Sequence, residues 1–153
     1  MLLSLFVIVG NFSSSAYADE TVTLSKGQSL YVPAYSHIYA GNREMEILLT
    51  VTLSIRNVDL KHSITITTVD YHGTKGERIR KYLDRAVVLS PFESKRFVIA
   101  QKDKSGGSGA NFLVVWKSEK SVNPPLIESV MIGAEGQQGI SFTSRGQVIT
   151  TTN

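Results

Sequence analysis

An alternation of apolar and hydroxyl side chains, with a period of two residues, most limits what this chain can fold into. From Thr50 to Ile55 every second residue is Val, Leu or Ile, and the residues between them are Thr or Ser. The segment 63–71, SITITTVDY, repeats the pattern. Because successive side chains of a strand point to opposite faces, both segments predict half-buried β-strands with one face in a core.

Turn residues separate these strands from further candidates, among them Asn57, Asp59 and the Gly-containing segment 72–76. The segment 111–117 is apolar on both faces, which predicts a central strand. We expect an all-β fold, an antiparallel Ig-like β-sandwich of about eight or nine short strands. The candidate strands are 47–55, 63–71, 86–89, 96–100, 111–117, 126–132, 139–142 and 147–151, with 77–84 as a strand or a helical turn.

The first 18 residues have the pattern of a secretory signal peptide. Leu2–Val9 is apolar and is much shorter than the about 20 residues that span a bilayer, and Ala16-Tyr17-Ala18 suits signal peptidase. No Lys or Arg precedes the apolar run, so the true start could lie upstream, and a retained anchor is the alternative. We expect cleavage near Ala18, a single domain at 19–153 without a transmembrane anchor, and a periplasmic or secreted location.

The absence of cysteine from the chain excludes several classes of chemistry. Disulfides, thiolate metal sites, a cysteine nucleophile and a lipid-modified cysteine all require that residue. The formal net charge is +3, which is too small to indicate a nucleic-acid-binding protein. We therefore expect no nucleic-acid partner and no cofactor.

Two resemblances support the predicted fold. The segment from Val51 to Ile99 resembles Ig-like and fibronectin-like sandwiches and the water-stress domain of late-embryogenesis-abundant proteins. The mature chain resembles, over nearly its whole length, a family of small exported bacterial domains of unknown function. The second resemblance implies export and a β fold but no activity, and it rests on the blocks Ser29–Tyr39, Leu53–Asn57, Tyr82-Leu83 and Gly109–Trp116.

Histidine and aspartate side chains form one candidate metal site. Asp70 and His72 are two residues apart, so they share a face of a straight strand, and Tyr35 and His37 share a face in the same way. If the two pairs converge, His37, Asp70 and His72 could bind a metal ion. The alternative is that these residues make ordinary hydrogen bonds at strand ends.

A basic cluster between Lys75 and Arg85 is a candidate ligand site. An extended strand would place Arg78 and Arg80 on one face, with Lys81 beside them. Guanidinium groups suit oxyanions, so the cluster could bind a phosphate, a sulfated glycan or an anionic lipid head group. The alternative is an edge strand whose charges prevent pairing with another sheet.

Three tyrosines recur every four residues, at Tyr31, Tyr35 and Tyr39. Pro33 and the Ala40-Gly41 pair argue against a helix here, and in an extended chain the even spacing places the three on one face. That face could pack in the core or could stack on sugars or a partner protein.

The segment Gly106–Ala110 nearly matches the nucleophile elbow of hydrolases. The elbow requires a helix after its serine, whereas a strand-forming run follows Ser108. A hydrolase is therefore a weak alternative.

Together these features predict an exported, non-enzymatic binding module. Its partner would be an envelope protein, a glycan or an anionic ligand, bound by Arg78, Arg80 and Lys81 or by the three tyrosines. A metal-binding protein that uses the two histidines is the alternative, ahead of a hydrolase.

Overall fold

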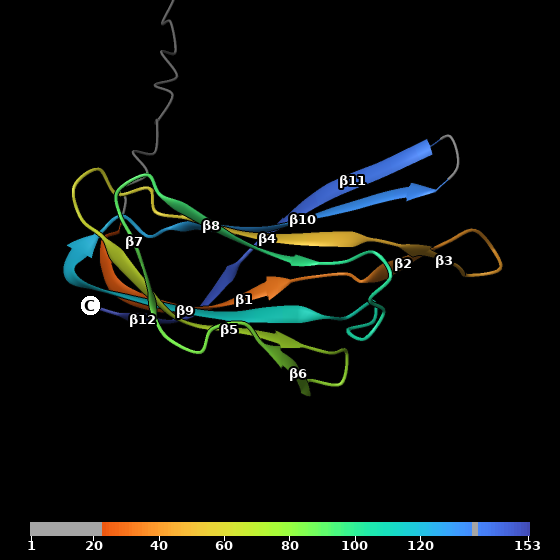
Figure 1. Cartoon of the computed structure of the whole chain (residues 1–153), viewed down its shortest axis with the longest axis horizontal. Helices are drawn as coiled ribbons and strands as arrows, with labels where there is room; N and C mark the ends of the chain where they lie inside the picture. Colours follow the sequence, from red (N-terminus) through yellow and green to blue (C-terminus); the bar gives the residue numbers. More distant parts are fainter. Residues whose placement is uncertain (1–22, 136–137) are drawn as a thin grey trace, which may run out of the picture.

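The chain folds into two antiparallel β-sheets that lie face to face (Figure 1). This computed structural model describes residues 23–135 and 138–153. The signal peptide expected at residues 1–18 lies outside the described residues. The predicted antiparallel sandwich is confirmed, since every strand pair in the described part is antiparallel.

The first sheet has β9 at its centre, which confirms the strand predicted to be central. Its path runs β12-β1-β9-β5-β6, and β7 pairs with β5 beside this path. The strands of this sheet are β1 (Ser25–Pro33), β5 (Ile64–His72), β6 (Arg78–Lys81), β7 (Val87–Leu89), β9 (Asn111–Val122) and β12 (Gln147–Thr152).

The second sheet has the order β11-β10-β4-β8. A separate two-stranded hairpin, β2-β3, extends from one end of the sandwich (Figure 1). These strands are β4 (Thr50–Arg56), β8 (Ser94–Ile99), β10 (Leu126–Glu135), β11 (Gln138–Arg145), β2 (His37–Ala40) and β3 (Met45–Leu48).

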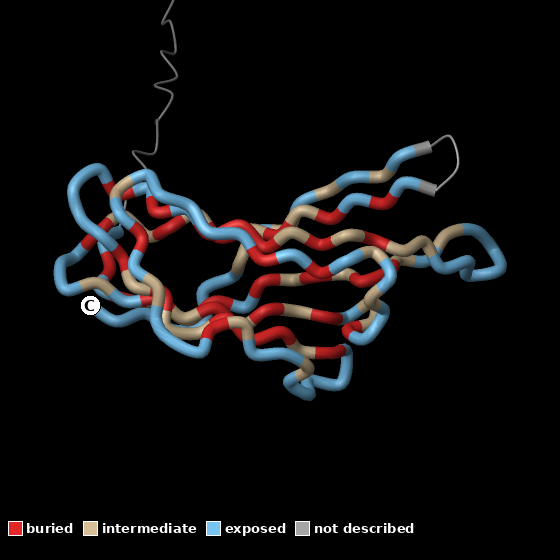
Figure 2. Tube along the Cα trace, in the orientation of Figure 1, coloured by how far each residue is buried: buried red, intermediate tan, exposed pale blue. Residues whose placement is uncertain are grey.

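The hydrophobic core fills the space between the two sheets, where buried stretches of the chain face one another (Figure 2). The alternation in β4 places Val51, Leu53 and Ile55 in this core, each with no exposed area. From the other sheet, β9 contributes Phe112 and Trp116. The period-two pattern therefore assigned the inner and outer faces of β4 correctly.

Twelve strands are present in the described residues, so the expectation of eight or nine was too low. The segment 47–55 was read as one strand, but it divides at Leu49, between β3 and β4. The backbone N–H of Leu49 donates to the carbonyl of Ser36, 3.0 Å away, where the chain passes from the hairpin into the second sheet. The segment 77–84, for which the sequence allows a strand or a helical turn, contains β6.

A buried polar cluster holds the loop after β4. The Asn57 side-chain amide donates to the carbonyls of His62, Leu89 and Ser90 at 2.9–3.1 Å. Its carbonyl oxygen accepts from the N–H of Asp59 at 3.0 Å. The turn chemistry expected of Asn57 and Asp59 is thus present, and it also ties this loop to the end of β7.

The Gly-rich loop before β9 packs against the end of β5. The N–H of Thr74 donates to the carbonyl of Gly106 at 2.9 Å. A Cβ atom at Gly106 would clash with the Tyr71 hydroxyl group, so a larger residue does not fit. Strand β9 begins three residues after Ser108, as the sequence predicts, in place of the helix that an elbow serine requires.

No helix long and apolar enough to cross a membrane occurs within residues 23–135 and 138–153.

Candidate functional site

The outer face of the first sheet brings together five of the residues singled out in the sequence. Leu30 and Val32 are buried on either side of Tyr31, so the Tyr31 side chain points outward and is 41% exposed. Val69 and Tyr71 are fully buried in the same way, which places Asp70 between them on the outer face. The alternation of β5 then directs His72 outward as well.

Strand register aligns these side chains in two rows across the sheet. In one row Tyr31 is opposite Leu113, Leu113 is opposite Asp70, and Asp70 is opposite Lys81. In the next row His72 lies between Asn111 and Arg78. Because strands are about 4.8 Å apart, the first row spans roughly 15 Å. We call these residues the outer-face patch: Tyr31, Asp70, His72, Arg78, Lys81, Asn111 and Leu113.

Asp70 is the most buried charged group of the patch, at 8% exposed. Its Oδ2 atom accepts a hydrogen bond from Arg78 Nη1 at 3.3 Å. Its Oδ1 atom is buried and has no hydrogen-bond partner in the described part of the chain, and the same holds for Nδ1 of His72. Both atoms lie beneath the surface of the patch, so the groups that a ligand meets there are the exposed side chains around them.

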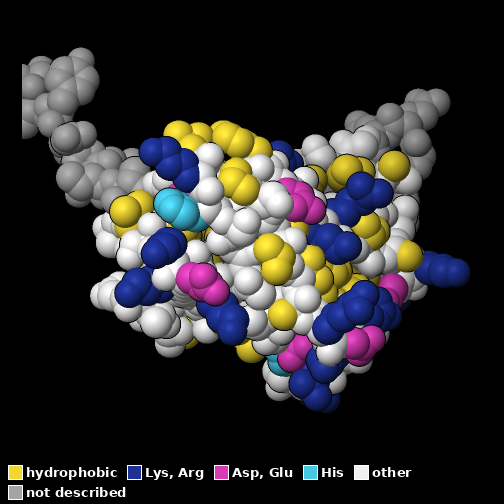
Figure 3. Space-filling model, turned by 60° about the vertical axis from the view of Figure 1, so that its left-hand side comes forward, with side chains coloured by type: hydrophobic (Ala, Val, Ile, Leu, Met, Phe, Trp, Pro, Cys, Tyr) yellow, Lys and Arg dark blue, Asp and Glu magenta, His cyan; other side chains and the backbone are white. Residues whose placement is uncertain are grey.

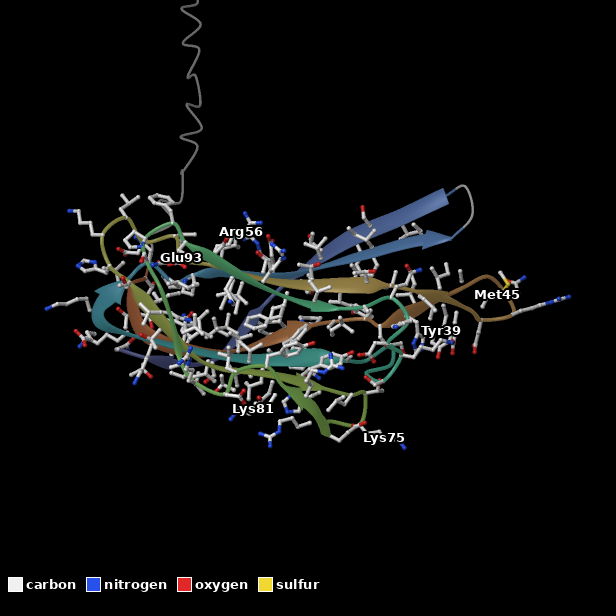
Figure 4. The ribbon with its side chains drawn as sticks, in the orientation of Figure 1. Tyr39, Met45, Arg56, Lys75, Lys81 and Glu93 are labelled. Atoms are coloured by element: carbon white, nitrogen blue, oxygen red, sulfur yellow. The ribbon has the colours of Figure 1, made fainter. Side chains whose placement is uncertain are left out.

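The prediction that Arg78 and Arg80 share a face is wrong. The β5–β6 register is irregular between Tyr71 and His72, so Arg80 is opposite the inward-facing Tyr71 whereas Arg78 is opposite the outward-facing His72. Arg78 and Lys81 therefore share the outer face. Figure 4 shows Lys81 on the side of the first sheet that faces away from the core.

Arg80 is held on the other side of β6. Its guanidinium donates to Oδ2 of Asp103 at 3.0 Å and to the Tyr82 hydroxyl at 3.1 Å. Hydrogen bonds from Ser105 and the nearby Arg80 charge hold the pKa of Asp103 below its ordinary value. The basic residues of β6 are thus partly neutralised, and Figure 3 shows acidic side chains among the basic ones on the face it presents.

The three tyrosines do not form one surface. The segment between β1 and β2 is not a strand, so the alternation of faces does not continue from Tyr31 to Tyr39. Tyr35 packs edge-on against Phe142, with ring centroids 5.7 Å apart. Tyr39 lies in the β2–β3 hairpin, far from Lys81 in Figure 4, and its hydroxyl is 3.1 Å from His37 Nε2. Of the three, Tyr31 alone belongs to the outer-face patch.

The structure does not assemble the predicted metal site. His37 lies at the start of the hairpin, with Nε2 4.0 Å from the Glu46 carboxylate, while Asp70 is paired with Arg78. Within the two described ranges, no three His, Cys, Asp or Glu side chains gather where they could hold a metal ion. The prediction that His37 converges with Asp70 and His72 on a metal ion is therefore wrong.

Sequence reasoning missed Asn111 and Leu113, the two patch residues on β9. The strand was read as apolar on both faces, so its outward residues were not separated from its inward ones. Burial of Phe112 and Val114 shows that the separation exists, with Asn111 and Leu113 on the half-buried outer side. The polar Asn111 at the start of the run was the signal that could have identified this face.

Comparison with known proteins gives one family and one similar structure. A family model described as "Protein of unknown function (DUF3124)" matches residues 27–149. No curated protein gives a significant match. A solved structure titled "Crystal Structure of Thermotoga maritima 1070" is similar at a TM-score of 0.47 and 12% identity, covering 78% of this chain and 92% of that one.

Proposed function

We propose that this chain, which belongs to the DUF3124 family of proteins of unknown function, is a non-enzymatic binding module that works outside the cytoplasm. Its ligand is a hydroxyl-rich molecule, a glycan, held against the outer-face patch. The observation that carries the proposal is the exposed Tyr31 side chain, which lies beside Leu113 on the row that leads to Asp70 and Lys81.

The accessible polar side chains of the patch favour a ligand rich in hydroxyl groups. Arg78 and Lys81 are exposed on β6, opposite His72 and Asp70 in the register. Their N–H groups can donate to sugar hydroxyl oxygens. Asn111 of β9, which is opposite His72, can both donate and accept.

Tyr31 and Leu113 supply the apolar part of such a site. They are neighbours across β1 and β9, on the row that leads to Asp70. Tyrosine offers a flat apolar ring with a polar end, which suits the C–H face of a sugar ring and its surrounding hydroxyl groups. The row combines an aromatic platform at one end with hydrogen-bonding groups at the other.

The composition of the patch favours holding a sugar over cleaving it. Glycoside hydrolysis generally uses two carboxyl groups on either side of the scissile bond. Among the seven patch residues Asp70 is the one carboxylate, and Arg78 holds it as an ion pair. This supports a binding role for the patch.

Binding of neutral oligosaccharides tests the proposal. We expect binding on an oligosaccharide array, confirmed by isothermal titration, to weaken at least about tenfold in Tyr31→Ala, which is about 1.4 kcal/mol. Tyr39→Ala is the matched control, because Tyr39 is also exposed but lies in the hairpin. Equal losses in both variants, or no binding of any oligosaccharide by the wild type, would contradict the patch as a glycan site.

Export has its own test, separate from the ligand. The segment Leu2–Ala18 predicts removal by signal peptidase, so protein recovered from bacterial cells should begin at Asp19 and should be found outside the cytoplasm. N-terminal sequencing of protein from fractionated cells measures both. Protein that keeps Met1 and remains in the cytoplasmic fraction would contradict export.

A further inference from the structure

The second sheet carries a basic depression on its outer face, on the opposite side of the sandwich from the outer-face patch. Figure 4 shows Arg56 on the outward side of this sheet and Lys81 on the outward side of the other. The depression has a volume of about 330 Å³. It is lined by Thr52, Ser54, Arg56, Ser94, Lys95, Arg96 and Val130.

From these residues we infer that the depression is a binding site for a tetrahedral oxyanion, a phosphate or sulfate group. The register places Arg56 opposite Ser94, and Ser54 opposite Arg96. The two guanidinium groups therefore belong to diagonal positions of the same outward face, with a serine beside each. Lys95 also lines the depression, but it is opposite the inward-facing Ile55, so its side chain does not start from the outward face. No lining residue is acidic.

The positive charges of the depression are not neutralised in the way those of β6 are. Arg78 and Arg80 each have a carboxylate oxygen within 3.3 Å. In the described part of the chain, no ion pair is formed by Arg56, Lys95 or Arg96. An anion bound here would supply the missing negative charge.

The nearest acidic residue in the register is Glu128 of β10, opposite Ser54. It does not line the depression, and Arg145 of β11 is opposite it on its other side. Glu93, just before β8, accepts a hydrogen bond from the backbone N–H of Ser90 at 2.8 Å. The outward-facing side chains of the lining therefore carry a charge of +2, from Arg56 and Arg96.

Arg56 is oriented for an anion before any ligand binds. Its Nε atom donates to the Ser54 hydroxyl at 3.1 Å, and Ser54 itself is 9% exposed. This bond occupies Nε and leaves the two terminal nitrogens available. The planar fork of a guanidinium group matches two oxygens of a phosphate or sulfate, and neighbouring hydroxyls can donate to the others.

Protection of the sheet edge explains only part of this arrangement. Charged side chains on an edge strand prevent pairing with other sheets, and β8 is an edge strand that carries Lys95 and Arg96. Arg56 lies on β4, which is paired on both sides by β10 and β8. An arginine on an internal strand has no edge to protect, so its place in the depression points to a ligand.

Titration with inorganic phosphate and with sulfate at fixed ionic strength tests the site. We expect saturable binding, followed by chemical-shift changes at β4 and β8, that weakens at least tenfold in the variant R56Q/R96Q. Arg43→Gln is the matched control, because Arg43 is exposed in the β2–β3 hairpin and its loss removes one positive charge elsewhere. Unchanged circular dichroism and melting temperature show that the variants are folded.

A second set of titrations identifies the source of the oxyanion. Vesicles of phosphatidylcholine with phosphatidylglycerol test a lipid headgroup, and vesicles of phosphatidylcholine alone are the control. Binding of the free ions, or of phosphatidylglycerol vesicles, that depends on Arg56 and Arg96 supports the inference and names the source. No binding of either probe, or an equal loss in Arg43→Gln, overturns it, because the attraction would then be absent or would follow net charge alone.

Discussion

Asn57→Ala is expected to lower the free energy of unfolding by about 3–4 kcal/mol, although it removes no apolar surface from the core. The Asn57 amide donates to three backbone carbonyls, one in the loop after β4 and two at the end of β7, and its oxygen accepts from the N–H of Asp59. Asn57 is 1% exposed, so water replaces few of these partners. Urea denaturation at neutral pH measures the loss.

Two further variants sharpen this prediction. Asn42→Ala is the matched control, because Asn42 is exposed in the β2–β3 turn and its loss should cost less than about 0.5 kcal/mol. Asn57→Asp keeps the acceptor for the Asp59 N–H but replaces the donor with an oxygen that faces three carbonyl oxygens. It should therefore be at least as unstable as Asn57→Ala. A stable Asn57→Asp protein would show that the donated hydrogen bonds contribute little.

The fold was predictable from the sequence wherever a strand has one apolar and one polar face. Strands β4 and β5 have such faces, because their inward residues bury a continuous core and their outward residues are mostly Thr or Ser. The β2–β3 hairpin lacks this signal, since Tyr39 and Met45 are both more than half exposed. Its turn depends on positive φ angles at Gly41 and Glu44, which apolar periodicity does not report.

The candidate site was predictable at the level of single strands but not across strands. The spacing of Asp70 and His72 correctly places both on one face, because two residues of a strand separate side chains that share a face. Which residues lie beside them depends on β9 pairing with both β1 and β5, an arrangement between segments distant in sequence. The register is irregular between Tyr71 and His72. Because of this local distortion, Lys81 shares the outer face with Arg78, and Arg80 does not.

The basic depression was missed for the same reason. Its charged residues come from two strands about 40 positions apart in the chain. Neither Ser54-Ile55-Arg56 nor Ser94-Lys95-Arg96 is a recognisable motif by itself. Only the pairing of Arg56 with Ser94 and of Ser54 with Arg96 brings the charges onto one surface. Pairing between distant strands is set by the packing of the whole core, so a single strand's pattern does not report it.

The second large effect is expected at Asp59, where stability should depend on pH. One Asp59 carboxylate oxygen accepts from the N–H groups of Lys61 and His62, each at 2.9 Å, and the other accepts from the N–H of Asn123 at 2.9 Å. These bonds, with those of Lys61 and Asn123 the strongest, hold the pKa of Asp59 far below its ordinary value. The charged carboxylate therefore joins the loop after β4 to the turn between β9 and β10.

The direction of the pH effect follows from this lowered pKa. Below about pH 4 the unfolded chain binds a proton at Asp59 while the folded chain does not, so acid favours the unfolded state. The stabilisation by Asp59 is complete at neutral pH and is lost progressively as the pH falls from about 5 toward 2. Urea denaturation across this range should show a steep loss of stability in the wild type.

Asp59→Asn isolates this carboxylate from the other acidic groups. The amide has nearly the same shape, but it replaces one acceptor oxygen with a donor that faces a backbone N–H, so the variant should lose about 2–4 kcal/mol at neutral pH. The gap between wild type and variant should narrow as the pH falls, because the wild type loses the stabilisation that the variant already lacks. Asp84→Asn, at an exposed carboxyl, should leave the acid slope unchanged. A gap that stays constant with pH would mean that the charge of Asp59 does not stabilise the loop and that its contacts act through shape alone.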